Sequence, residues 1–341
     1  MTRIIFSPVA ALAFSLAAVA VLQGCGGSDS TAHTAVVNQL FLEDPHSGKI
    51  AAFPTASPDS GTAFSSHVVA GVAGATGAMA FDPTHDLLYV AVTDASTNTA
   101  SIQVFADADM MTAGKPWRTI TFEPGVEAFS VITKLVWQAP TDTLWVYGRN
   151  ESGLIALAGG SLVAIANASN VNGQVPEAGT VGVRTGSTTT SFAYDAGRDV
   201  AFASGVEDAS GNLVPGVAVF AAASTKFSTS GLTQPTGTID IPGAVDVALD
   251  ASRDLLYVAD SQHGLWVVQQ AGSATPVLVG PIAMAGVSSV SVDAVTDRLV
   301  VGAGASGYVF APASAITTAS VFPAAAVTTS SGVISSAAFN N

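Results

Sequence analysis

The chain has 341 residues, of which 49% are hydrophobic and only 11% charged, with 33 glycines and 16 prolines. This balance is typical of many short strands packed face to face and joined by tight turns. The formal net charge of −14 repels polyphosphate backbones and therefore argues against nucleic acid as a partner. The length equals that of two average domains, but closed β architectures often reach it as a single domain.

Residues 1–24 have the profile of a secretory signal peptide. Arg3 precedes an apolar run from Ile4 to Val21, and Leu22-Gln23-Gly24 leads directly into Cys25, the only cysteine of the chain. The alternative is a transmembrane anchor, although the run is at the short edge of what spans a bilayer. The Leu-Gln-Gly-Cys sequence resembles the lipobox of bacterial lipoproteins. The resemblance implies that Cys25 is acylated and anchors the mature chain in a membrane.

Residues 25–37 are predicted to be the lipidated cysteine and a flexible tether. The segment Gly26-Gly27-Ser28-Asp29-Ser30-Thr31 is small and polar, as expected for a chain that keeps a domain clear of the membrane surface. A small residue rather than Asp after the cysteine resembles the outer-membrane sorting signal of Gram-negative lipoproteins. We therefore expect a lipid-anchored protein of the bacterial envelope, at the outer membrane.

A short motif recurs along residues 38–341, which we predict to form one all-β domain. Each copy contains an apolar strand, a turn with two polar residues four apart, and a second strand rich in β-branched and aromatic residues. The last residue of the first strand, here called the anchor, falls at intervals of 56, 57, 55, 43 and 47 residues: Asp82, Gln138, Asp195, Asp250, Asp293 and Asn340. Repeats of this length predict the blades of a β-propeller. No interval reaches the roughly 80 residues that two blades need. We therefore predict six blades, with seven as the alternative.

The two ends of this domain are predicted to share one blade. Gln39-Leu40-Phe41-Leu42 matches only the second strand of the motif, and Ala337-Ala338-Phe339-Asn340 matches only the first. Pairing of the two strands would close the ring and remove a free sheet edge.

One copy carries a family resemblance. Asp250 to Asp260, with the sequence DASRDLLYVAD, followed by Gly264-Leu265-Trp266-Val267-Val268, resembles the repeats of the NHL and YVTN β-propeller families. The resemblance implies the fold over most of residues 38–341. These families include enzymes, sugar binders and scaffolds, so it implies no particular activity.

Carboxylate pairs, which acid–base catalysis would need, occur in four copies of the motif: Asp82/Asp86, Asp195/Asp199, Asp250/Asp254 and Asp293/Asp297. Repetition favours a structural role, because a reaction needs its acid and base once, whereas every blade needs this turn. Asp suits such turns because its carboxylate accepts hydrogen bonds from nearby backbone N–H groups. Arg198, Arg253 and Arg298 are the expected partners of these pairs.

In NHL-type repeats the residue four before the anchor faces the central channel. The corresponding residues here are Ala78, Lys134, Ser191, Asp246, Ser289 and Ser336. A single carboxylate beside a lysine disfavours a metal site of several oxygens, and we assign no metal or cofactor. Lys134 and Asp246 are the predicted ligand contacts at the channel mouth. The alternatives are a mutual salt bridge or two solvated loop residues.

Aromatic and methionine residues lead to two further predictions. Met110, Met111 and Trp117, in the insert 107–127, are predicted to form an exposed hydrophobic patch for a protein partner, the alternative being a loop packed over the propeller edge. Trp137, Trp145 and Trp266 lie at strand positions where other copies carry Tyr, Phe, Leu or Val, and are predicted to belong to the core.

The sequence favours a binding or scaffold propeller for an envelope protein complex or a surface polymer, with no catalytic residue assigned. A second hypothesis is a lactonase- or esterase-like enzyme that uses Lys134 and Asp246 at the channel mouth. A third is a sugar-binding module, which would need exposed aromatic residues repeated at equivalent loops, and none repeat.

Overall fold

The computed structural model divides the chain into two compact units, Met1–Thr34 and Ala35–Asn341, and the residues it describes belong to the second. They are residues 39–44, 49–54, 67–71, 74–106, 116–122, 129–138, 141–149, 160–175, 191–208, 210, 212–223, 234–304, 306–317, 323, 325–328 and 336–340. Cys25 and the predicted segments 1–24 and 25–37 lie outside these ranges.

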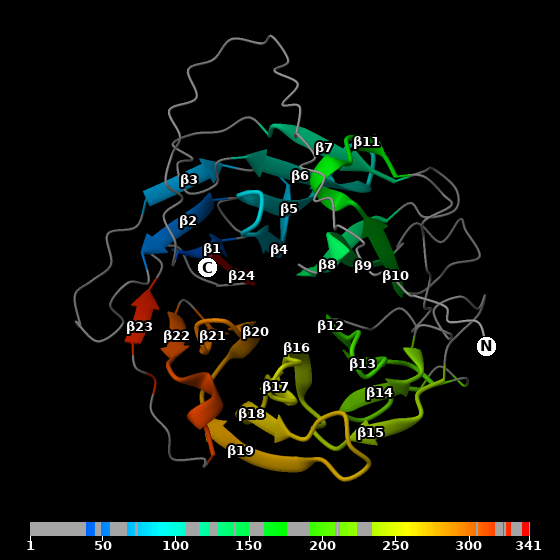
Figure 1. Ribbon diagram of the computed structural model, residues 1–341, viewed down its shortest axis with the longest axis vertical. Helices are drawn as coiled ribbons and strands as arrows, with labels where there is room; N and C mark the ends of the chain where they lie inside the picture. The colour runs from blue at the N-terminus through cyan, green and yellow to red at the C-terminus, as the bar shows by residue number, and fades with distance from the viewer. Residues whose placement is uncertain are drawn as a thin grey trace, which may run out of the picture. The chain divides into compact units, whose positions relative to one another are not determined.

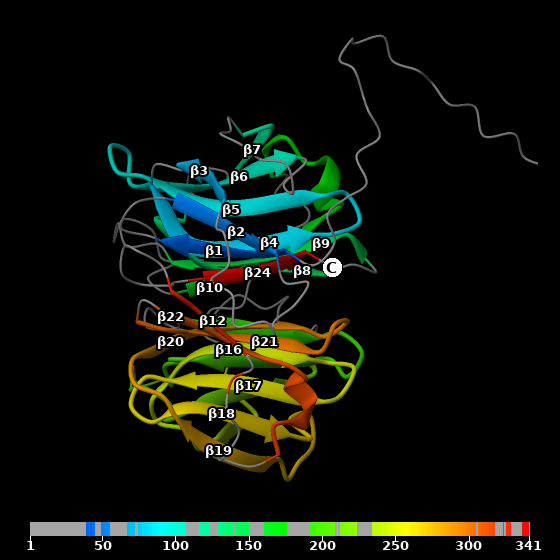
Figure 2. The same cartoon turned by 90° about the vertical axis from the view of Figure 1, so that its left-hand side faces the viewer.

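The described strands form six sheets placed side by side in a ring (Figures 1 and 2). The first sheet contains β24 (Ser336–Asn340), β1 (Gln39–Asp44), β2 (Lys49–Pro54) and β3 (His67–Gly71). The second contains β4 (Ala75–Asp82), β5 (Leu87–Asp94), β6 (Thr99–Ala106), β7 (Arg118–Thr121) and β11 (Gly173–Gln174). The third contains β8 (Val131–Gln138), β9 (Thr143–Arg149) and β10 (Gly160–Ala166).

The other three sheets have four strands each. They are β12 (Ser191–Asp195), β13 (Val200–Ser204), β14 (Val217–Ala221) and β15 (Gly237–Ile239); β16 (Ala244–Asp250), β17 (Leu255–Asp260), β18 (Gly264–Gln269) and β19 (Val277–Ala283); and β20 (Val287–Asp293), β21 (Arg298–Ala303), β22 (Ser306–Phe310) and β23 (Ala325–Thr328). Two short 3₁₀ helices, η4 (Ala168–Asn170) and η6 (Ala313–Ala315), follow β10 and β22.

The prediction of six blades, with seven as the alternative, is wrong. Among the described residues, five sheets reach the four strands of a complete blade, and the sheet β10-β9-β8 has only three. The reason lies after β10, where the chain turns through η4 and its next strand, β11, leaves the sheet. β11 pairs instead in parallel with β7, Gly173 opposite Ile120, and becomes the fifth strand of the preceding blade.

The predicted closure between the two ends of the domain is confirmed. β24 pairs with β1 in antiparallel register, from Gln39 opposite Asn340 to Glu43 opposite Ser336. The innermost strands of the six sheets are β24, β4, β8, β12, β16 and β20 (Figure 1). Each contacts the next in this order, and β20 contacts β24. The N- and C-terminal strands therefore complete the ring.

The anchors lie where the motif places them, each at the end of an inner strand. The carboxylates of the four Asp anchors hold the turn that follows. Oδ1 of Asp195 accepts hydrogen bonds from the backbone N–H groups of Gly197 and Arg198, at 2.9 and 3.0 Å. The second Asp of each pair has a left-handed backbone, with φ of 51°, 55°, 56° and 56° at Asp86, Asp199, Asp254 and Asp297. Asp tolerates this conformation better than most residues. The structural interpretation of the repeated carboxylate pairs is confirmed.

Two of the predicted arginine partners also join neighbouring sheets. Nη1 of Arg198 lies 2.6 Å from Oδ2 of Asp195 and donates to the carbonyl oxygen of Ala251 at 2.8 Å. Arg253 makes the same pair of contacts with Asp250 and Ala294, at 2.6 and 2.8 Å. Each guanidinium therefore ties its own turn to the turn of the next sheet.

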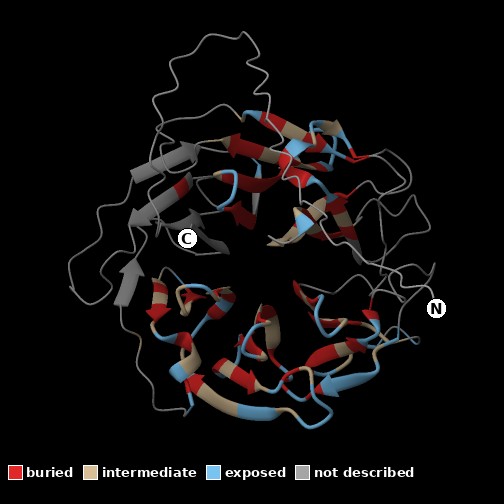
Figure 3. Cartoon of the chain, in the orientation of Figure 1, coloured by how far each residue is buried: buried red, intermediate tan, exposed pale blue. Residues whose placement is uncertain are grey.

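The hydrophobic core lies between the sheets rather than within any one of them. Strands β13 and β17 are buried along their whole length, and the inner strands of the lower half of Figure 3 are mostly buried. One cluster of buried residues spans β4–β6 and β8–β10, and another spans β16–β18 and β20–β22. This packing brings the ends of the inner strands together, where the candidate site lies.

Candidate functional site

Lys134 and Asp246 meet inside the ring of inner strands. Nζ of Lys134 lies 2.7 Å from Oδ1 of Asp246, and the two side chains are 19% and 11% exposed. The structure thus brings the two predicted residues together, from β8 and β16, as the mutual salt bridge that was the alternative to a ligand site. Their role as ligand contacts stays a prediction.

Asp246 has further partners on two other inner strands. The Ser191 hydroxyl, on β12, donates a short hydrogen bond to Oδ1 of Asp246. The N–H of Val247 donates to the same oxygen at 2.9 Å, and the N–H of Val290, on β20, donates to Oδ2 at 2.8 Å. One carboxylate therefore connects β8, β12, β16 and β20. We call Lys134, Ser191 and Asp246 the channel cluster.

A local irregularity precedes Lys134 and Asp246 in their inner strands, whereas β12, which carries Ser191, pairs in regular register. The pairing register shifts between Ile132 and Lys134 in β8, and between Ala244 and Asp246 in β16. The same shift precedes Ser289 in β20. A β-bulge turns the following residue away from regular alternation and commonly re-aims a side chain near a site. An irregularity of this kind therefore accompanies the channel position in β8, β16 and β20.

The channel cluster has the residue types of a nucleophilic hydrolase, but its geometry does not provide an open nucleophile. Counted as whole residues, Ser191 is 1% exposed and Asp246 is 8% exposed, and their side chains are hydrogen-bonded to each other. Nucleophilic catalysis requires a base that can take the proton of a hydroxyl while that hydroxyl faces substrate. The geometry of the cluster therefore favours a structural role, in which it links the inner strands, over a catalytic one. The carboxylate's hydrogen bonds to Ser191 and to the Val290 N–H were not foreseen from the sequence.

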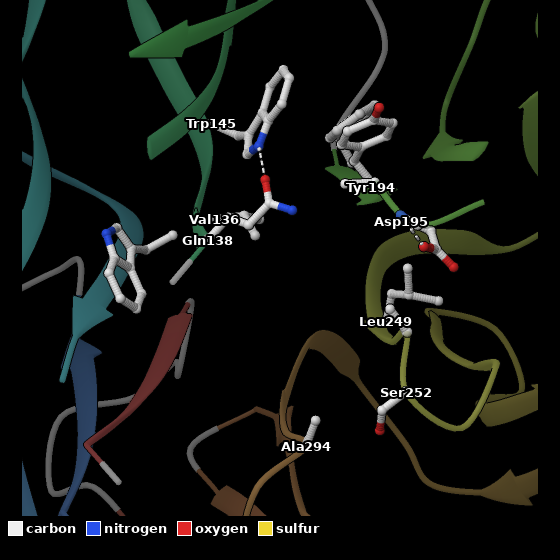
Figure 4. A pocket seen from close by; sticks show the side chains of 13 residues that line it. Val136, Gln138, Trp145, Tyr194, Asp195, Leu249, Ser252 and Ala294 are labelled. Carbon is white, nitrogen blue, oxygen red and sulfur yellow. Dashed lines mark hydrogen bonds between the residues drawn. The ribbon is translucent and has the colours of Figure 1, made fainter. Parts of the chain in front are cut away.

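A pocket of about 330 Å³ lies where β8, β12 and β16 end (Figure 4). Its lining combines aromatic, small and a few polar side chains: Val136, Trp137, Gln138, Trp145, Phe192, Tyr194, Asp195, Ala196, Gly197, Leu249, Ala251, Ser252 and Ala294. Mostly apolar pockets with a few placed polar groups are the usual form of small-ligand sites. We call it the anchor pocket, because Gln138 and Asp195 are anchors of the repeat.

The polar groups of the anchor pocket are held in fixed orientations. The Trp145 Nε1–H donates to Oε1 of Gln138 at 3.2 Å, as Figure 4 shows. An indole can only donate, so the amide oxygen must face Trp145, and the amide NH₂ is left to point into the pocket. The rings of Trp145 and Tyr194 meet edge to face, with centroids 5.1 Å apart.

Tyr194 is fixed at its far end as well. Its hydroxyl donates to Oδ1 of Asp199 at 3.0 Å. Burial, and next the hydrogen bond to Asp199, raise the pKa of Tyr194 to about 12, so the hydroxyl remains a protonated donor at neutral pH. Trp145 and Tyr194 are therefore a rigid aromatic pair.

The prediction that three tryptophans belong to the core holds only in part. Trp137, Trp145 and Trp266 are half-buried and pack against core clusters, but Trp137 and Trp145 also line the anchor pocket. A signal was present in the sequence, because this copy alone combines an amide anchor, Gln138, with a tryptophan seven residues later.

Among the described residues, one group of side chains could hold a metal ion by distance alone. Ligand atoms of Asp82, His85 and Asp142 lie within 4.8 Å of one another. Their bonds serve the turns instead: Nδ1 of His85 lies 2.6 Å from Oδ2 of Asp82, and both Asp142 oxygens accept from Ser169 of η4. His85 occupies the position that Arg198 and Arg253 hold in other copies, three residues after the anchor.

The predicted partner patch is described only at Trp117. Met110 and Met111 lie outside the described residues. Trp117 is 59% exposed, and the guanidinium of Arg118 lies 4.0 Å from its ring centroid, a cation–π contact. Exposure of Trp117 agrees with the patch, whereas its role in partner binding stays a prediction.

No family model and no curated protein matches the chain. Within the described ranges, no helix is both long and apolar enough to cross a bilayer. Among solved structures, the chain is similar to one in the crystal structure of a nidogen/laminin complex, with 10% identity and a TM-score of 0.55. The similarity covers 89% of this chain and 98% of that one. At this identity it shows the fold alone, which is that of a β-propeller.

Proposed function

We propose that this protein is a binding propeller, tethered by lipid in a bacterial envelope, that holds an envelope partner or surface polymer at the anchor pocket. The observation that carries the proposal is the contrast between the two polar groupings of the ring. The side chains of the channel cluster bond to one another and to backbone N–H groups of the inner strands, whereas the Gln138 amide NH₂ points into the anchor pocket (Figure 4). A preformed pocket with few convergent polar groups supports binding. Membership in the NHL or YVTN propeller families, which the repeats resemble, is also part of this proposal.

Anchoring rests on Cys25 and the residue after it. Replacing Cys25 with serine is expected to move the protein from the membrane fraction to the soluble fraction, because the acyl chains supply the attachment. Fractionation of carbonate-washed membranes and incorporation of labelled palmitate measure this. Gly26→Asp should keep the label but retain the protein at the inner membrane. A Cys25→Ser protein that still sediments with membranes would contradict the lipid anchor.

Binding at the anchor pocket is tested by crosslinking in intact cells. A photo-crosslinking amino acid at Ser252, an exposed residue of the pocket lining, is expected to give discrete adducts after irradiation. The matched control is the same amino acid at Gln262, which is exposed in the turn after β17, at the other end of the inner and second strands. Adducts at neither position, or equal adducts at both, would count against a binding role for this pocket.

A further inference from the structure

We propose that the anchor pocket binds one neutral sugar ring of a glycan, stacked against Trp145 and Tyr194 and held through Gln138. This inference rests on the proposed binding function and names the chemical class of its ligand. Three features of the pocket support it: the aromatic wall formed by Trp145 and Tyr194, the polar groups of Gln138 and Ser252, and the lack of an unpaired charged side chain among the lining residues.

The aromatic wall is rigid before any ligand arrives. Trp145 is fixed through its indole N–H to Gln138, and Tyr194 through its hydroxyl to Asp199, at 3.2 and 3.0 Å. Side chains that are already ordered lose little conformational entropy on binding. The C–H faces of a pyranose ring pack well against such aromatic surface, because the ring carries positive hydrogens to the negative aromatic face.

The polar groups of the pocket favour a ligand that has an apolar face and hydrogen-bonding groups along its edge. The Gln138 amide NH₂ offers donors, and the Ser252 hydroxyl, which donates to Oδ1 of Asp250 at 2.6 Å, retains its lone pairs as acceptors. Sugar hydroxyls both donate and accept and can therefore satisfy both groups. An apolar peptide side chain in the same place would leave the amide facing hydrocarbon, at a cost in free energy.

The charged groups near the pocket neutralise one another. Asp195 accepts from the backbone of Gly197 and Arg198 and pairs with the Arg198 guanidinium at 2.6 Å. That guanidinium also donates to the carbonyl oxygen of Ala251. Asp195 is the only charged side chain among the lining residues, and it is already paired with Arg198. The lining therefore has no charge to balance an ionic ligand, and a neutral sugar fits better than a phosphorylated or acidic one.

The volume limits how much of a glycan enters. About 330 Å³ is near the lower end of the roughly 300–1,000 Å³ typical of small-ligand pockets. One ring is therefore expected inside, with further units over the rim. Val295, 80% exposed and adjacent to the lining residue Ala294, offers apolar surface there.

The test uses the full chain carrying Cys25→Ser, on an array of neutral and acidic bacterial glycans, followed by titration of the retained oligosaccharides with tryptophan fluorescence as the readout. We expect saturable binding of at least one neutral glycan. Gln138→Glu keeps an acceptor for Trp145 but removes the NH₂ donors, and should weaken binding at least tenfold with an unchanged midpoint of thermal unfolding. Trp145→Phe should weaken it as well. Gln262→Glu, the same change outside the pocket, should bind as the parent does.

Three results would overturn the inference: no glycan is retained, acidic glycans bind in place of neutral ones, or neutral glycans bind equally to the Gln138→Glu protein. Crosslinking from Ser252 separates this failure from failure of the proposed function. Specific protein adducts without any glycan binding would leave a binding propeller whose ligand is a protein. Absence of both would remove the binding role itself.

Discussion

Replacing Asp246 with alanine is expected to lower the free energy of unfolding by about 3–5 kcal/mol, the usual cost of breaking a buried ion pair by removing one partner. The change leaves the largely buried Lys134 ammonium without its carboxylate. It also leaves the N–H of Val290 without the acceptor that it reaches at 2.8 Å. Urea unfolding of the Cys25→Ser chain, followed by circular dichroism, gives the measurement.

Two comparisons make the Asp246 result specific. The double variant Lys134→Met, Asp246→Ala should be more stable than Asp246→Ala alone, because no unpaired charge remains in the channel. Asp240→Ala, at an exposed position, should stay within about 0.5 kcal/mol of the parent. If Asp246→Ala cost under about 1 kcal/mol, the carboxylate would not be holding four inner strands together, and the ligand interpretation of Lys134 and Asp246 would gain ground.

Removal of residues 336–341 is expected to destabilise the domain more than any single substitution, with loss of a soluble monomer. The deletion takes away β24, which pairs with β1 over five residues and also contacts β4 and β20. It exposes the backbone edge of β1, and unpaired edges of this kind promote association between chains. Size-exclusion chromatography and thermal unfolding of the truncated chain measure both effects.

A circular permutant is the matched control for the truncation. Gln39 and Asn340 are paired residues, so a linker of two to four residues from the C-terminus to the start of β1 forms a hairpin. New termini between Ser273 and Ala274, in an exposed turn, leave every strand intact. This protein should fold with nearly the parent midpoint. A truncated chain that remains monomeric and equally stable would mean that closure by the terminal strands is dispensable.

Local features of the fold could be predicted because they depend on residues close in sequence. The anchor positions end the inner strands as expected, since a strand, a turn capped by Asp and a returning strand are decided within about 15 residues. The αL conformation at Asp199 and Asp254 follows from the same turn chemistry. The pairing of the terminal strands was predictable as well, because each end carries one half of a repeated motif.

Features that depend on distant segments were missed or wrong. The predicted number of blades was wrong because β11 pairs with β7 rather than with β10. Contacts between different sheets favour this pairing. In one of them, the Arg118 guanidinium donates to the carbonyl oxygen of Ser169. The anchor pocket was missed because Trp145 and Tyr194 come from different sheets, and a strand pattern alone does not distinguish a core face from a pocket wall.

Sequence alone therefore determined the all-β class, the turn chemistry at Asp195 and its counterparts, and the pairing of the two terminal strands, since each depends on local hydrogen bonding or on repetition along the chain. The tertiary structure decided how many sheets are complete blades, which groups surround Asp246 and which way the Gln138 amide points. Those outcomes depend on which strands become neighbours in the ring. Packing between sheets settles that choice, and no short stretch of residues encodes it.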